Sequence, residues 1–268
     1  MLALVVPLKS KRNSDNWEMV SQLCIRSLKS ICSQDDEGFV VALVCNEVPD
    51  LSDLTTKERE KIDVLQLPFL HRESYRKSGT EVIKLDSYFE NDKALKLRHG
   101  FEHVTTRYAA SYLMSVDADD CVSSKLAGYV RTNKGAAGWY ANSGYVYPEG
   151  GKIIFHKRKN FQQLCGTSII IATEFRNRVF RNEDGLLIYN HWGMLTGDVE
   201  IIPLPFPAAV YSVKNGENCH MTAELQKKLL FNPKFLNPRS LLQRLSRYRF
   251  SRLRKSHFSI FGLYPVDS

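Results

Sequence analysis

The stretch "YLMSVDADDCVSS" places three carboxylates, Asp117, Asp119 and Asp120, directly after an apolar run that has the length of a buried strand. Side chains alternate along a strand, so Asp117 and Asp119 are expected on one side, and Asp120 can face elsewhere as the chain turns. Two carboxylates about 6–7 Å apart by strand rise repel one another. A hard divalent cation would remove that penalty, so the pattern indicates a cation site. The alternative is a polar loop that caps a following helix.

Alternating strand and helix patterns lead up to the acidic segment. Compact apolar runs at 2–8, 39–45 and 61–69 predict buried strands, and apolar residues at helical spacing predict helices over 16–31 and 92–104. This order is typical of a parallel sheet with crossover helices. The acids would then follow the fourth strand, at the carboxyl edge of the sheet where ligands bind in such folds.

The pattern changes beyond residue 135. Aromatic and β-branched residues broken by Gly and Pro over 138–157 predict short, partly antiparallel strands. Two more strands are expected at 168–175 and, interrupted by prolines, at 199–213. The segment 182–195, "NEDGLLIYNHWGML", is predicted to be a helix or a helix-flanked loop. We therefore expect one continuous α/β domain over 1–222.

The formal net charge of +8 is concentrated at the C-terminal end. Ten Lys and Arg follow residue 224, against one acid, Asp267, so 223–268 is predicted to be a basic, amphipathic helical extension. Its apolar stripe comprises Leu241, Leu242, Leu245 and Tyr248. Such a helix favours an anionic membrane surface as partner. Nucleic acid is the less favoured partner, and a helix packed on the domain with a solvated basic face is the plain alternative.

Cysteine usage and the N-terminus predict a cytoplasmic protein, and the basic tail predicts a peripheral position on the inner face of the plasma membrane. The six cysteines show no CxxC pair and no Cys/His ligand spacing, which indicates buried reduced thiols. The first apolar run is short and lacks the basic region of a signal peptide.

The order of these features resembles the GT-A glycosyltransferases, closest to the glycosyltransferase family 2-like enzymes. The resemblance covers 1–222 and rests on "LVVPL", "VCNE", "DKALKLRHGFEHV" and "MSVDADD". It implies a Rossmann-like nucleotide-sugar half (1–122) with a mixed, mainly parallel central sheet, and an acceptor half (123–222). It also implies a hexosyltransferase-type enzyme of bacterial surface polysaccharide synthesis, inverting and dependent on Mn²⁺ or Mg²⁺. Such an enzyme would move a sugar from a UDP or GDP donor to a glycan or lipid-linked acceptor.

The resemblance also assigns roles to residues of the nucleotide half. The nucleobase and ribose would contact Pro7, Leu8, Asn46 and Glu47. Asp117 would lie nearer the nucleoside, while Asp119 and Asp120 would hold the metal. Lys93 and Arg98 would contact the nucleotide or its phosphates, or be solvated helix charges.

In the second half, Glu183 and Asp184 stand where the family carries its catalytic acid, and one of them would be the general base. They could instead open a helix. "VYSVKNGENCH" resembles the Tyr-Arg-x-His-Gly-x-Asn element, with Lys214 or Asn215 in place of His. Lys214 would then neutralise diphosphate charge. His191 and His220 are the substitute metal ligands, or packed histidines.

Two other classes of function fit parts of the pattern. A nucleotidyltransferase also joins an α/β nucleotide domain to metal-binding carboxylates, but no Gly-rich phosphate loop with a following Lys occurs near the first strand. A non-enzymatic basic adaptor would bind membrane or nucleic acid through the tail, with the acidic turn being structural.

Overall fold

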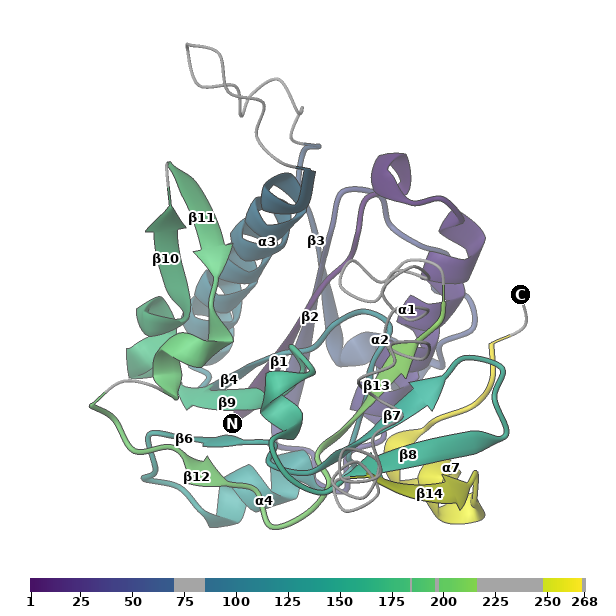
Figure 1. Ribbon diagram of the computed structural model, residues 1–268. Helices are drawn as coiled ribbons and strands as arrows, with labels where there is room; N and C mark the ends of the chain where they lie inside the picture. The colour runs from purple at the N-terminus through teal and green to yellow at the C-terminus, as the bar shows by residue number, and fades with distance from the viewer. Residues whose placement is uncertain (70–84, 184, 196–197, 216–247, 267–268) are drawn as a thin grey trace, which may run out of the picture.

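The computed structural model describes residues 1–69, 85–183, 185–195, 198–215 and 248–266 (Figure 1). A seven-stranded sheet in the order β12-β6-β9-β4-β1-β2-β3 forms its centre. Its strands are β1 (Leu2–Pro7), β2 (Phe39–Cys45), β3 (Ile62–Gln66), β4 (Tyr112–Ser115), β6 (Gly138–Tyr140), β9 (Ile169–Ala172) and β12 (Ile202–Pro203). β9 runs antiparallel to its neighbours β4 and β6, and the other pairs are parallel. The predicted α/β class with a mixed, mainly parallel central sheet is confirmed.

Helices on both faces explain the continuous apolar runs of β1 and β2. Leu4 packs in the hydrophobic cluster that includes α1 (Trp17–Cys32), whereas Val5 packs with α3 (Leu85–Tyr108) on the opposite face. α3 approaches β1 closely, since a Cβ on Gly100 would lie 2.3 Å from Cγ1 of Val5. This packing fixes the N-terminal half of α3 beside the carboxyl ends of the strands.

A second sheet lies beside the first, in the order β14-β8-β7-β13-β5. Its strands are β5 (Cys121–Val122), β7 (Gly144–Pro148), β8 (Ile153–Lys157), β13 (Ala209–Val213) and β14 (Tyr248–Arg252). Its core contains Phe261 of α7 (Lys255–Phe261), which packs with Cys121 and Ile154. Residues 248–266 therefore pack on the body of the protein.

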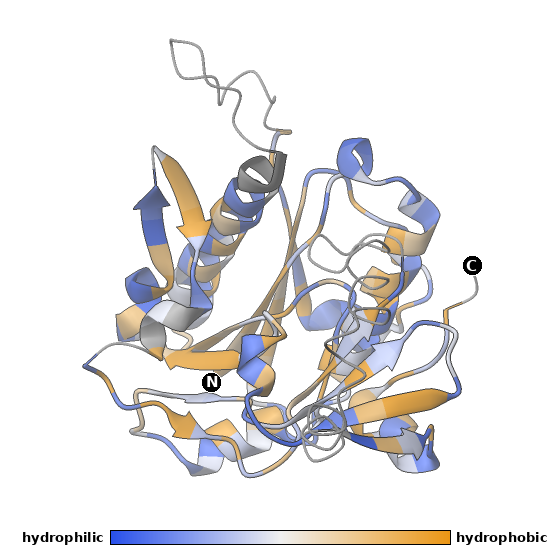
Figure 2. Ribbon diagram, in the orientation of Figure 1, coloured by the Kyte–Doolittle hydropathy of each residue, from blue (hydrophilic) through white to orange (hydrophobic). Residues whose placement is uncertain are grey.

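Two sequence-based predictions of secondary structure are wrong. Tyr248, assigned to a helical stripe, begins strand β14, and the other stripe residues lie outside the described residues. The first part of the segment 182–195, which was predicted as a helix or a helix-flanked loop, belongs to an antiparallel hairpin of β10 (Phe180–Glu183) and β11 (Leu186–Tyr189), and a short 3₁₀ helix follows at His191–Met194. Gly185 makes its turn with φ of +84°, and apolar β11 faces α3 while hydrophilic β10 lies outside (Figure 2).

Short elements complete the fold. They are α2 (Thr56–Glu60), α4 (Leu126–Thr132) and the 3₁₀ helices η1 (Lys11–Asn13), η3 (Phe161–Gln163), η4 (Thr173–Val179) and η5 (His191–Met194). Within the described ranges, no helix combines the length and the apolar character that crossing a bilayer requires.

Candidate functional site

Polar side chains gather where β1, β2 and β4 end. The three strands are parallel, so the segments after them meet at one edge of the sheet. Leu8 follows β1, Asn46 follows β2, and the acidic turn Asp117–Asp120 follows β4. The N-terminal half of α3 lies along the same edge and contributes Lys93.

Lys93 and Asp117 form an ion pair at the start of the acidic turn. Lys93 Nζ lies 2.5 Å from Asp117 Oδ1, with side chains 34% and 23% exposed. Burial by itself would lower the pKa of Lys93, but the charge of Asp117, its hydrogen bond, and Tyr189 and Asp120 raise that pKa above its usual value. Lys93 therefore remains an ammonium ion beside the acids. Its assignment to the nucleotide or its phosphates stays a prediction.

Asp119 holds a partly exposed carboxylate in the middle of the turn. Asn215 Nδ2 donates to its Oδ2 at 2.7 Å, and Arg26 Nη2 donates to its backbone carbonyl at 3.1 Å. Burial, followed by the charge of Asp117, raises the pKa of Asp119 to about 6. Negative charge is thus kept on Asp119 at a free-energy cost, which is a common feature of functional carboxylates.

Asp120 is a structural acid, which corrects its assignment as a metal ligand. It is fully buried, and it accepts hydrogen bonds from Thr167 Oγ1 at 2.6 Å, from the backbone N–H of Ser212 at 3.1 Å and from Cys165 Sγ at 3.2 Å. Burial, followed by Asp119 and Asp117, raises its pKa well above the usual value. Its oxygens connect β4, β13 and the loop before β9, so they are used within the fold.

The loop 165–168 closes over the acidic turn, and sequence analysis missed it. Thr167 Oγ1 accepts from the backbone N–H of Asp117 at 2.9 Å while donating to Asp120. A Cβ on Gly166 would lie 2.8 Å from Asp117 Oδ2 and 3.4 Å from Lys93 Nζ. The signal in the sequence is "CGTS", a Gly beside two hydroxyl residues just before a strand.

The residues assigned to the nucleobase line the edge formed by β1 and β2. Asn46 is 7% exposed; its Nδ2 donates to the carbonyls of Leu67 and Pro68, and its buried Oδ1 accepts no hydrogen bond in the part of the chain described. Such an orphaned acceptor is costly unless a ligand satisfies it. Glu47 accepts from Ser10 Oγ and from the backbone N–H of Lys11, which holds the loop after β1.

Pro7 and Leu8 are buried, so they can offer backbone rather than side chains to a ligand. The carbonyl of Leu8 accepts from Lys96 Nζ at 2.8 Å, and the same ammonium pairs with Asp92 Oδ2 at 2.7 Å. Lys96 was missed although it lies one turn after Lys93. Arg98, which was predicted, lies on the exposed part of α3, about 140° around the helix from Lys93.

Only some of the second-half residues that were assigned to the site lie near the acidic turn in the described structure. Glu183 lies on β10, 54% exposed, and pairs with Arg181, while Asp184 lies outside the described residues. No helix begins at Glu183 in the described structure, so the capping alternative is wrong for it, while its catalytic role stays a prediction. Lys214 is exposed with φ of +64°, and this left-handed turn presents the next residue, Asn215, to Asp119.

The histidines do not complete a metal site in the described structure. Nε2 of His191 lies 3.3 Å from the carbonyl oxygen of Gln162, and burial, followed by the charge of Lys93, lowers the pKa of His191. His191 is therefore buried close to Lys93 and Asp117, and its role as a metal ligand stays a prediction. His220 lies outside the described residues.

The acidic turn suits a cation that binds together with a phosphate ligand. It suits less well a metal ion whose ligands all come from the protein. Among the described residues, no group of three His, Cys, Asp or Glu side chains is arranged to hold a metal. Mg²⁺ and Mn²⁺ sites in nucleotide enzymes need only one or two carboxylates, completed by water and phosphate oxygens. Asp119 fits that role because a cation would offset the burial and the charge of Asp117 that raise its pKa.

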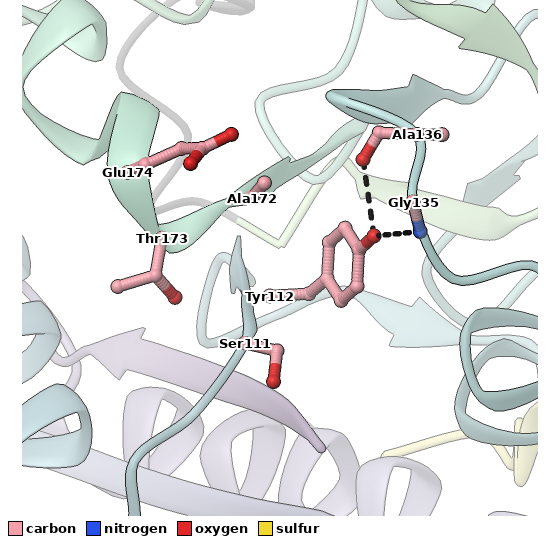
Figure 3. Close-up of a pocket in the computed structure, with 7 residues that line it drawn as sticks. All are labelled: Ser111, Tyr112, Gly135, Ala136, Ala172, Thr173 and Glu174. Carbon is pink, nitrogen blue, oxygen red and sulfur yellow. Dashed lines mark hydrogen bonds between the residues drawn. The ribbon is translucent and has the colours of Figure 1, made fainter.

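A hollow of about 270 Å³ lies at the other end of β4, away from the acids (Figure 3). Tyr112 stands in its wall with its hydroxyl bonded to the carbonyl of Ala136 and the N–H of Gly135. It is lined by Ser111, Tyr112, Gly135, Ala136, Ala172, Thr173 and Glu174. Glu174 is the one charged residue among those that line the hollow, so we do not assign the function there.

Comparison with known proteins gives distant likenesses in structure only. No family model and no curated protein matches the chain. A crystal structure of Staphylococcus aureus TarS 1–349 matches at 15% identity and a TM-score of 0.42, over 79% of this chain and 60% of that chain. A second TarS structure matches at 15% identity and a TM-score of 0.41, over 96% of this chain and 45% of that chain. A structure of Rv0371c from Mycobacterium tuberculosis H37Rv matches at 7% identity and a TM-score of 0.37, over 79% of this chain and 88% of that chain. The chain thus spans less than two thirds of either TarS structure, and nothing about its activity follows from these matches.

Proposed function

We propose that this protein is a glycosyltransferase that transfers a hexose from a nucleoside diphosphate donor to a glycan or lipid-linked acceptor. The observation that carries the proposal is the ion pair between Lys93 and Asp117. Asp119 follows Asp117 by two residues, and its ionised form is disfavoured because its pKa is raised. The ammonium ion can bind the oxygens of a diphosphate, and the neighbouring carboxylate can bind the divalent metal ion that accompanies it. The buried acceptor of Asn46, at the adjacent strand end, supports a nucleobase on that side.

In the proposed reaction, an acceptor hydroxyl gives its proton to a base and attacks the anomeric carbon, the bond from that carbon to the diphosphate oxygen breaks, and the nucleoside diphosphate leaves. Asp119 would hold a divalent cation that stabilises charge on the leaving diphosphate. Lys93 contributes a second positive charge at the same place. The resemblance to family 2-like enzymes supports inversion at the anomeric carbon and a role in bacterial surface polysaccharide synthesis. The exposed position of Glu183 leaves the general base unassigned.

Product analysis tests the class of reaction. The protein is incubated with UDP- and GDP-sugars and Mn²⁺, and we expect free nucleoside diphosphate from the wild type. Asp119→Ala should abolish its release, whereas Asp198→Ala, which removes an exposed acid paired with Arg178, should not. Release of pyrophosphate instead would identify a nucleotidyltransferase, and equal activity of Asp119→Ala and wild type would reject the proposed site.

A further inference from the structure

The outer strands of the second sheet expose apolar side chains on one face. In the β14–β8 pairing, Phe250 lies opposite Phe155 and Arg252 lies opposite Ile153, so these four side chains share that face. Phe250 is 59% exposed and Ile153 48%, and Phe250 is the most exposed large apolar side chain of the described residues. We call Ile153, Phe155, Phe250 and Arg252 the outer strip. Exposed apolar side chains that adjoin one another in this way mark interaction surfaces.

The opposite face of the same strands is covered. Ile154 alternates with the outer strip along β8 and is fully buried against Phe261 of α7. His156, on that same face, stacks on Tyr145. The sheet therefore has one face packed on α7, while the outer strip lies on the other.

The surroundings of the outer strip are strongly basic. Residues 150–160 and 248–266 contain eight Lys and Arg and no Asp or Glu. Their summed charge of +8 equals the formal net charge of the whole chain. Arg249, Arg252, Arg254 and Lys255 are exposed, and none of them forms an ion pair within the part of the chain that the structure covers. The surface therefore attracts an anionic partner.

We propose that the outer strip docks on an anionic membrane surface. Apolar side chains surrounded by cations bind such a surface by burying apolar area and by attracting acidic headgroups, and each basic residue near it contributes about 1 kcal/mol. The rings of Phe155 and Phe250 meet edge to face, with centroids 5.2 Å apart, and lie beside an aliphatic side chain. That arrangement suits insertion among lipid headgroups better than stacking of nucleobases, which uses open ring faces. The docking surface proposed here is a sheet face, and the predicted helical stripe before Tyr248 lies outside the described residues.

Vesicle cosedimentation of the full-length protein tests the proposal. We expect binding to phosphatidylcholine vesicles that contain phosphatidylglycerol, and little binding to phosphatidylcholine alone. Phe250→Ser with Ile153→Ser should weaken binding about tenfold, and Arg252→Gln about fivefold. The matched controls are Val64→Ser, at a 38% exposed apolar residue of edge strand β3, and Lys57→Gln, at an exposed cation, and both should bind like the wild type.

Two further readouts distinguish lipid docking from misfolding and from nucleic-acid binding. Thermal unfolding should have the same midpoint in the outer-strip variants and the wild type, and nucleoside diphosphate with Mn²⁺ should raise all these midpoints equally if the nucleotide site is intact. Failure of the wild type to bind anionic vesicles, or unchanged binding by the outer-strip variants, would overturn the proposal. So would variants that lose affinity for a single-stranded oligonucleotide while keeping their affinity for vesicles.

Discussion

Arg26 donates a hydrogen bond from Nη2 to the backbone carbonyl of Asp119, with an N···O distance of 3.1 Å. Arg26 is fully buried, and the same nitrogen donates to Ser212 Oγ at 2.8 Å. Its Nη1 pairs with Glu149 and donates to the carbonyl of Tyr264. One guanidinium therefore ties the acidic turn to β13, to the residue after β7 and to the chain beyond α7.

We predict that Arg26→Met destabilises the protein by about 3–5 kcal/mol, because Glu149 keeps a buried charge without its partner. Arg26→Met with Glu149→Gln should recover most of that stability, since neither charge remains. Nucleotide binding should stay weak in the double variant, because the carbonyl of Asp119 still lacks its donor. Chemical denaturation and calorimetric titration measure the two effects. Full recovery of nucleotide binding in the double variant would show that Arg26 does not position the turn.

Asp119→Asn is predicted to stabilise the folded protein while removing cation-dependent binding. The folded-state pKa of Asp119, about 6, exceeds the usual value of an unfolded chain, about 4. The stability that this proton contributes is therefore present below about pH 4 and is lost as the pH rises through 6. Asn at this position is neutral and keeps an acceptor for Asn215, so above about pH 7 it should gain up to about 3 kcal/mol.

Denaturant unfolding of the wild type and Asp119→Asn across this pH range checks the prediction. The difference in unfolding free energy should shrink toward acid pH. A variant that is less stable than the wild type at neutral pH would mean that the carboxylate of Asp119 is held for structural reasons.

Gly166→Ala should disturb the Lys93–Asp117 pair, because the added Cβ would lie 2.8 Å from Asp117 Oδ2. We expect a stability loss of about 1–3 kcal/mol, as for other overpacked sites, together with weaker nucleotide binding. Gly38→Ala is a matched control, since its Cβ would also lie 2.8 Å from a carboxylate oxygen, that of Asp36, before β2. The control should lose stability only. If both variants bind nucleotide equally well, loop 165–168 is not part of the site.

The sequence predicted those elements whose apolar pattern has a single interpretation. "FVVALVC" is too short and too continuously apolar for an amphipathic helix, and β2 has these bounds. The β10–β11 hairpin was missed because "NEDGLLIY" carries apolar residues at spacings that suit either period, and the turn at Gly185 decides between them.

The acidic turn could be found from sequence, but its partners could not. Asp119 accepts hydrogen bonds from Arg26 and Asn215, which are 93 and 96 residues away in the chain. Asp120 accepts one from Thr167, which is 47 residues away. These contacts depend on the packing of α1, β13 and the loop before β9, which local patterns do not reveal. Lys93 was singled out because it lies on the helix that precedes β4 in the chain.

Calorimetric titration of nucleoside diphosphate with Mn²⁺ into the wild type and Asp119→Asn tests the central claim most directly. The proposed site predicts wild-type binding that requires both components and weakens as the pH falls below about 6, where Asp119 takes up its proton, and no metal-dependent binding by the variant. Equal Mn²⁺-dependent affinity of the two proteins would contradict the assignment of the acidic turn as a nucleotide site.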